Sequence, residues 1–223
     1  MPQTHIRVGW VGGGWGVGGG AGGSGRRVSV MTIRAATFAD ERQIARICLL
    51  TGADGGDATG QFTDDAVLAD VFAVPYLRGP GCVALVWDVE GQARGYVLAA
   101  ADTSAFQAWF SNEWWPSRRH REAHTPGDAW LLPSAADPKR CLNAAVADYP
   151  AHLHIDLLPD QQGKGAGRRL IDAMCEALRG SGVPGVHLVA SAANRGALAF
   201  YPRVGFNEIA RDATTVTFAR DLV

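Results

Sequence analysis

The segment 151–180 constrains the fold most, because it joins a strand, a glycine-rich loop and a long helix in immediate succession. Apolar and polar residues alternate from 151 to 158, which predicts a half-buried strand that ends at Pro159. The loop 160–167 carries three glycines at alternate positions, and apolar side chains recur at helical spacing from 170 to 178. This succession is typical of an α/β domain that brings a loop backbone close to a ligand.

The loop between this strand and helix predicts a site for an anionic ligand. Gly163, Gly165 and Gly167 let backbone N–H groups approach a ligand without an intervening side chain. The loop leads into a helix N-terminus, where unpaired N–H groups and the helix dipole attract anions. Lys164 and Arg168 oppose that dipole, so their presence indicates a negatively charged partner, and a pyrophosphate fits.

Two familiar phosphate-binding loops do not match this segment. The P-loop spacing is absent, and the glycines lie two apart instead of following G-x-G-x-x-G. That dinucleotide spacing does occur at Gly14-x-Gly16-x-x-Gly19, but it requires a helix directly afterwards, and more glycine follows instead. A nicotinamide oxidoreductase is therefore a third hypothesis, which needs order in residues 8–19.

Residues 1–30 differ in composition from the rest of the chain. The stretch 12–25 is mostly glycine, and such a segment has too little apolar surface to bury. We therefore expect a disordered glycine-rich tail at 1–30 and one folded domain at 31–223. Met1 and Met31 both stay open as the start of the protein.

The folded part alternates helix and strand signals. A short strand at 32–36 precedes a helix in which Ile44, Ile47 and Cys48 share one face. Further elements are expected as a weaker helix at 64–77, a strand pair at 83–87 and 95–99, a strand at 186–190, a helix from Asn194 through Tyr201, and two final strands.

Composition narrows the class of protein. The formal net charge of the 223 residues is −1, which argues against nucleic-acid binding, because that usually needs a basic patch or stripe. Four scattered cysteines without a C-x-x-C pair predict neither a disulfide framework nor a metal site. No apolar run is long enough to span a membrane. These features favour a reduced, cytoplasmic location.

The loop resembles the signature Q/R-x-x-G-x-G/A of GNAT acetyltransferases. Gln162, Gly165 and Gly167 occupy its fixed positions. The resemblance covers residues 31 to about 220, and the run from Tyr149 to Phe206 is also similar to the acetyltransferase-like C-terminal domain of O-GlcNAcases. Its other supports are Leu157-Leu158-Pro159 before the loop, and Asn194, Ala197, Phe200-Tyr201 and Gly205-Phe206 after it.

The resemblance implies a fold and a cosubstrate. The fold would be α/β, layered, with a mixed, mostly antiparallel sheet and helices on both faces. Acetyl-coenzyme A would lie between two splayed central strands, with its pyrophosphate on the loop backbone. The implied binding residues are Ile155, Leu157, Leu158, Gln162, Gly163, Lys164, Gly165, Ala166, Gly167, Arg168, Asn194 and Ala197.

The resemblance also implies catalytic groups. Tyr201 matches the family's general acid, and a phenol can protonate a departing thiolate; the alternative is a structural tyrosine. Asp156 and His154, on the polar face of the strand, are the candidate bases, or else belong to a solvated or hydrogen-bonded face. His152 lies further away and is expected to be structural. Asn194 can cap its helix, contact coenzyme A, or do both.

The implied reaction is acetyl transfer to an amine, without a metal. The alternative is a module that holds acetyl-coenzyme A without turnover, because fold does not fix function. The acceptor is a small-molecule or protein amine, and a homodimer is compatible with the sequence. The tryptophans of the segment 101–150 either pack as core or shape the acceptor pocket.

Overall fold

The computed structural model describes residues 30–118 and 121–223. Apart from Val30, the predicted tail at 1–30 therefore lies outside the described residues, as does the dinucleotide-loop hypothesis at 8–19. Within the described part, no helix combines the length and the apolar character that crossing a bilayer requires.

In this part of the chain, seven strands form one sheet in the order β1-β2-β3-β4-β5-β7-β6. Antiparallel pairing joins every pair of neighbours except β4 and β5, which run parallel. The predicted mixed, mostly antiparallel sheet is confirmed. The strands are β1 Met31–Ala35, β2 Cys82–Val89, β3 Gln92–Ala100, β4 Ala151–Leu157, β5 Gly185–Ser191, β6 Asn207–Arg211 and β7 Thr215–Asp221.

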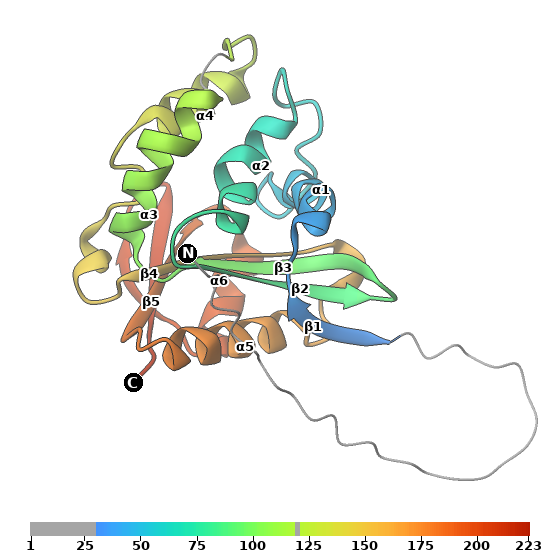
Figure 1. Cartoon of the computed structure of the whole chain (residues 1–223), viewed down its shortest axis with the longest axis vertical. Helices are drawn as coiled ribbons and strands as arrows, with labels where there is room; N and C mark the ends of the chain where they lie inside the picture. The colour runs from blue at the N-terminus through green and yellow to red at the C-terminus, as the bar shows by residue number, and fades with distance from the viewer. Residues whose placement is uncertain (1–29, 119–120) are drawn as a thin grey trace, which may run out of the picture.

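Helices cover both faces of the sheet, also as predicted. The first four lie on one face, and the last two lie on the other (Figure 1). The helices are α1 Glu41–Thr51, α2 Ala66–Phe72, α3 Thr103–Trp109, α4 Pro126–Ala136, α5 Ala166–Gly180 and α6 Arg195–Phe200.

Alternation along the central strands builds two apolar layers. On β3, Tyr96 and Leu98 pack toward α1 to α4, while Val97 and Ala99 pack toward α5. On β4, Leu153 joins the α5 layer, so the polar residues of the strand point into the other layer. This polar face therefore lies under helices, which makes its hydrogen bonds and protonation states matter for function.

Two helices end earlier than the sequence pattern indicates. The expected helix at 64–77 divides into α2 and a 3-10 turn, Val74–Leu77, which contains Pro75. The helix expected through Tyr201 ends at Phe200, and a 3-10 turn continues to Val204. Proline accounts for both breaks, because it lacks the N–H group that would continue the helical hydrogen bonds, although Tyr201 before Pro202 itself keeps helical φ and ψ.

Candidate functional site

Strands β4 and β5 separate soon after they meet. They pair only at Ala151 with Val186 and at His152 with His187. Beyond these pairs, one edge of β4 has no strand partner, while the opposite edge continues on β3. We call this separation the β4–β5 gap, and it corresponds to the splayed strands that the sequence resemblance implied.

Backbone groups of β4 point alternately into the gap and toward β3. The N–H of Leu158 donates to the carbonyl of Arg94 on β3 at 3.0 Å. By alternation, the N–H groups of Ile155 and Leu157 face the gap. These two donors are the ones expected to meet a bound acyl group, whereas the Leu158 N–H is already committed to β3.

The loop at the end of β4 reaches α5 through two glycines in left-handed geometry. Gly163 has φ +71° and Gly165 has φ +81°, and a Cβ at either position would meet no described atom within 4 Å. Gly165 is the N-cap of α5 and offers no side-chain cap, so the first N–H groups of the helix stay open to a ligand. Gln162 steadies the loop, because its Nε2 donates to the Leu157 carbonyl at 2.9 Å.

The third glycine of the motif has a packing role. Gly167 is buried, and a Cβ there would lie 3.0 Å from Cζ of Phe200. Its neighbour Ala166 is also buried. The motif therefore divides into an exposed part, 162–165, which can meet a ligand, and a buried part, which seats α5 against α6.

The cations around the loop have different partners. Arg168 donates from Nη2 to the Arg203 carbonyl, and the Arg169 guanidinium lies 4.8 Å from the centre of the Trp87 ring. Lys164 is exposed, and no ion pair involving it occurs among the described residues. The sequence argument that these cations need an anion therefore rests mainly on Lys164.

Asn194 acts as a helix cap. Its Oδ1 accepts a hydrogen bond from the Ala197 N–H at 3.0 Å at the start of α6. Its amide nitrogen faces the loop after α1, because a Cβ on Gly55 would lie 3.6 Å from it. Asn194 thus caps its helix, which is one of the two roles that the sequence indicated. Contact with coenzyme A stays a prediction for Asn194 and Ala197.

Asp156 lies beside Tyr96, its register partner on β3. The Tyr96 hydroxyl donates to Oδ2 of Asp156 at 2.5 Å. Burial raises the pKa of Asp156 to about 6, although hydrogen bonds from Tyr96 and Thr51 act to lower it. The carboxyl group therefore titrates close to neutral pH, which suits a proton acceptor.

Tyr201 approaches the same region from the end of α6. Its ring packs against Phe200, Phe206 and Phe218, with ring centroids 5.3 to 5.9 Å apart. Burial raises its pKa, and the nearby charge of Asp156 raises it further. The phenol consequently holds its proton at neutral pH, as a general acid must.

The two histidines of β4 differ in their partners. Thr103 donates to the Pro150 carbonyl at 2.7 Å, so its oxygen accepts from Nδ1 of His152 at 2.9 Å. Nε2 of His152 then accepts from the Tyr76 hydroxyl at 2.6 Å. This fully used ring is structural, as expected. Burial, and after it the charge of Arg140, lower the pKa of His154 to about 4, so its imidazole is neutral at pH 7.

The tryptophans fall into two environments. Trp114 and Trp115 are buried, and Trp115 stacks on Phe110 with ring centroids 6.0 Å apart. Trp130 is 59% exposed and stacks on Phe72 at 6.4 Å. Core packing therefore describes the first two, whereas Trp130 lies at the surface.

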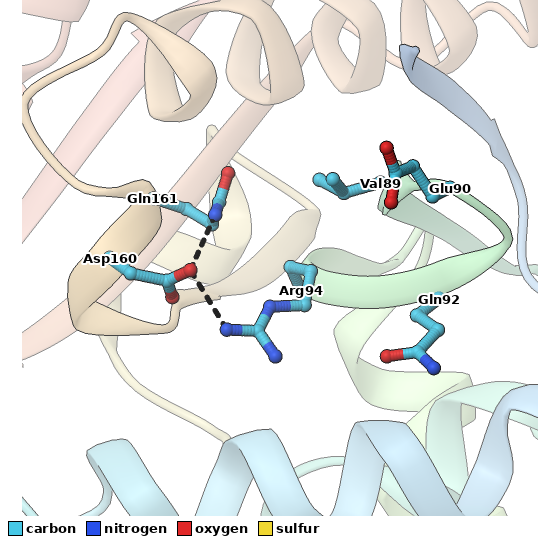
Figure 2. Close-up of a pocket in the computed structure, with 6 residues that line it drawn as sticks. All are labelled: Val89, Glu90, Gln92, Arg94, Asp160 and Gln161. Atoms are coloured by element: carbon cyan, nitrogen blue, oxygen red, sulfur yellow. Dashed lines mark hydrogen bonds and ion pairs between the residues drawn. The ribbon is translucent and has the colours of Figure 1, made fainter. Parts of the chain in front are cut away.

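A shallow pocket of about 300 Å³ lies between the β2–β3 turn and the start of the glycine loop. Figure 2 shows Asp160 between two donors, and it accepts from Arg94 at 2.8 Å and from Gln161 at 2.7 Å. The Gln161 side chain also accepts from the indole N–H of Trp87 at 3.2 Å. These paired groups fasten the start of the glycine loop to β2 and β3, so we interpret the pocket as part of the support of the loop.

Sequence reasoning missed several neighbours of the candidate base. Tyr96 falls in an expected strand, but nothing in the sequence indicates that it pairs with Asp156. Phe72 and Arg140 come from segments with weak or irregular patterns, and both lie near His154. Only the sheet order and the loop paths bring these residues together.

Comparison with known proteins identifies the family. The model of the acetyltransferase (GNAT) family matches residues 61–206. The crystal structure of SsHAT is 37% identical and covers 86% of this chain and 98% of its own, with a TM-score of 0.80.

More distant solved structures share the fold. The PaiA N-acetyltransferase from Thermoplasma acidophilum, in complex with coenzyme A, is 12% identical, with a TM-score of 0.52 over 86% of this chain and 99% of its own. A phosphinothricin acetyltransferase from Sinorhizobium meliloti, in complex with acetyl-CoA, is 18% identical, with a TM-score of 0.52 over 86% of this chain and 88% of its own.

The family match spans most of the described domain, and it includes the glycine loop, α5 and the turn at Tyr201. The relation to O-GlcNAcase domains stays a prediction. The resemblance inferred from Gln162, Gly165 and Gly167 is confirmed, and the chain belongs to the GNAT acetyltransferase family.

Proposed function

We propose that this protein transfers an acetyl group from acetyl-coenzyme A to an amine at the β4–β5 gap. The observation that carries the proposal is the β4–β5 gap, and three features of the segments around it support it. These are the N–H groups of Ile155 and Leu157 facing the gap, the uncapped start of α5, and the Asp156 and Tyr201 side chains.

The gap and the loop fit the cosubstrate chemically. Acetyl-coenzyme A supplies an acetyl thioester and a pyrophosphate. The exposed backbone at 163–165 and the open N–H groups of α5 suit the pyrophosphate, and Lys164 adds positive charge. The N–H groups of Ile155 and Leu157 suit the acetyl carbonyl and the adjoining arm, where donors stabilise developing negative charge.

Asp156 and Tyr201 divide the proton transfers. Asp156, with a pKa of about 6, accepts the proton of the attacking amine, directly or through one water. Tyr201, with a raised pKa, donates its proton to the sulfur as the carbon–sulfur bond breaks. His154 is the second candidate base, but a pKa of about 4 makes it the weaker acceptor.

Measuring coenzyme A release from acetyl-coenzyme A with a panel of amines tests the proposal. We expect turnover with at least one amine, and loss of most of that turnover in Asp156→Asn. Calorimetry with acetyl-coenzyme A separates binding from chemistry. Tight binding without turnover on any amine would favour the module that holds the cosubstrate without reaction.

A further inference from the structure

Arg140 presents buried donors that no described residue satisfies. Its Nε and Nη2 atoms are buried and have no hydrogen-bond partner in the parts of the chain that the structure describes. No carboxylate among those residues forms an ion pair with it. Arg140 as a whole is half-buried, but buried N–H donors that stay unpaired are costly to maintain, so this edge of the guanidinium calls for an anionic partner.

The two unsatisfied atoms lie on one edge of the guanidinium. Nε–H and the adjacent Nη2–H point in parallel, which is the arrangement that holds a carboxylate through two hydrogen bonds. Arg211 uses the same edge in this protein, where Nε and Nη2 each donate to a Glu208 oxygen at 2.7 Å. Arg140 therefore offers the complete geometry of a carboxylate site.

Aromatic rings hold this edge in place. The Arg140 guanidinium carbon lies 4.5 Å from the centre of the Phe110 ring and 5.7 Å from that of Phe72. Such contacts stabilise a cation without using its N–H groups. The orientation is thus set by packing, and none of the described residues uses the hydrogen-bonding edge.

Phe72 connects Arg140 with the proposed reaction site. The His154 ring meets the Phe72 ring edge-on at 5.9 Å, and Trp130 stacks on Phe72 from the exposed side. His154 precedes Asp156 by two residues on the same face of β4, so their Cα atoms are only about 7 Å apart. Arg140 is thus connected to Asp156 through Phe72 and His154, and we expect an acceptor that contacts both charged groups to be a small molecule.

The charges around this cluster favour an anion. His152, His154 and His187 all have lowered pKa values because of burial, so their rings are neutral at pH 7. Arg140 is then the charged group on this face near His154, apart from Asp156, which serves the amine. Arg140 therefore attracts a carboxylate, and Asp156 accepts a proton from an amine.

We propose that Arg140 binds the carboxylate of the acceptor, which is therefore a small amino acid-like molecule with an apolar part that contacts Phe72 and Trp130. This inference rests on the proposed acetyl transfer, because it names the substrate class of that reaction. The carboxylate binds Arg140, the amine on the adjacent carbon meets Asp156, and the apolar side chain contacts Phe72 and Trp130.

Matched acceptors test the inference without changing the protein. Coenzyme A release is measured with L-phenylalanine, L-tryptophan and L-leucine, and with phenethylamine, tryptamine and isoamylamine, which lack only the carboxylate. We expect KM to be at least about tenfold lower for the acids, the value of a good charged hydrogen-bond pair. Equal KM values for the acids and the amines would overturn the inference and leave acetyl transfer intact.

Variants of Arg140 provide the second arm. In Arg140→Gln the KM of the preferred acid should rise about 10- to 100-fold, while the KM values of its amine analogue and of acetyl-coenzyme A stay unchanged. The KM of the preferred acid in Arg140→Lys should lie between those of the wild type and Arg140→Gln, because lysine keeps the charge but lacks the two-donor edge. Arg211→Gln, which removes the same edge on β6, is the control and should change none of these constants.

Direct binding separates failure of this inference from failure of the proposed function. If no compound is acetylated, calorimetry with L-phenylalanine and coenzyme A still decides. Binding to the wild type that weakens in Arg140→Lys, with that variant melting like the wild type, supports a carboxylate site without acetyl transfer. If none of the three acids binds, the site does not exist.

Discussion

Tyr96 donates a hydrogen bond of 2.5 Å to Asp156 from the strand directly beside it, and Tyr96 itself is fully buried. The pair links the core to the β4–β5 gap. Burial pushes the pKa of Asp156 upward and the Tyr96 hydroxyl pulls it down, and the balance leaves the group near pH 6.

Asp156→Asn should lower kcat by about 10²- to 10⁴-fold, the usual effect of removing a general base. In the wild type, kcat/KM should fall below a pH of about 6, because protonated Asp156 cannot accept a proton. We call this fall in kcat/KM the acidic limb of the pH profile. Measuring the profile with two acceptors of different amine pKa identifies its origin, since a limb caused by an enzyme group lies at the same pH for both acceptors. An Asp156→Asn variant with the same acidic limb and full kcat would point to His154 or to water as the base.

Tyr96→Phe should shift the acidic limb to higher pH. The change removes the hydrogen bond that stabilises the Asp156 carboxylate and keeps the buried ring, so the pKa of Asp156 rises. The activity measured well above the shifted limb should change much less than in Asp156→Asn. A limb that stays in place, or moves to lower pH, would contradict the role of this hydrogen bond.

Asp156→Asn should also stabilise the protein at pH 8 while it removes activity. The folded-state pKa is about 6 against 3.8 in the unfolded chain, so the stability tied to this carboxyl is complete below a pH of about 4 and is lost as the pH rises through 6. At pH 8 the free energy of unfolding of Asp156→Asn should therefore exceed that of the wild type by on the order of 3 kcal/mol. Urea unfolding at pH 8 and at pH 4 measures it, and an equal effect at both pH values would be inconsistent with titration of Asp156.

Local sequence patterns predicted most of the fold, because they depend on neighbours in the chain. The alternation on 151–158 and the helical spacing after the loop are set by residues two to four apart, and both elements form as expected. The glycine loop could likewise be predicted from the sequence, since Gly163 and Gly165 take the left-handed geometry that glycine adopts easily. The sequence could not predict which of these glycines face a ligand and which pack against the protein, because Phe200 meets Gly167 only in the folded chain.

The polar face of β4 shows where sequence reasoning stops. Alternation placed His152, His154 and Asp156 on one face, but it could not tell whether water or protein covers that face. The answer depends on α1 to α4 packing there, and on long-range partners such as Tyr76 and Tyr96. Protonation states follow from that burial, so the candidate base could be proposed from sequence but not ranked.

Gly165→Val should weaken binding of acetyl-coenzyme A at least about tenfold, which calorimetry measures. The new side chain meets no described atom, so it projects into the space where the pyrophosphate is expected. The left-handed φ also costs about 1–2 kcal/mol of stability. Gly182→Val is the matched control, because Gly182 has φ +77° and equally open surroundings at the other end of α5. Equal affinity in both variants would remove the loop from the cosubstrate site.

Tyr201→Phe should lower kcat by about 10²- to 10⁴-fold and leave acetyl-coenzyme A binding nearly unchanged. The ring contacts with Phe206 and Phe218 persist, so the variant should melt like the wild type. The loss belongs in kcat, because the proton matters only as the carbon–sulfur bond breaks. Burial and the Asp156 charge raise the pKa of Tyr201, so the wild type should keep its activity up to a pH of at least about 10. An acetyl thioester with a more acidic leaving thiol needs less help from an acid, and it should therefore recover part of the rate in Tyr201→Phe. Full kcat in Tyr201→Phe with acetyl-coenzyme A would assign the acid role to water.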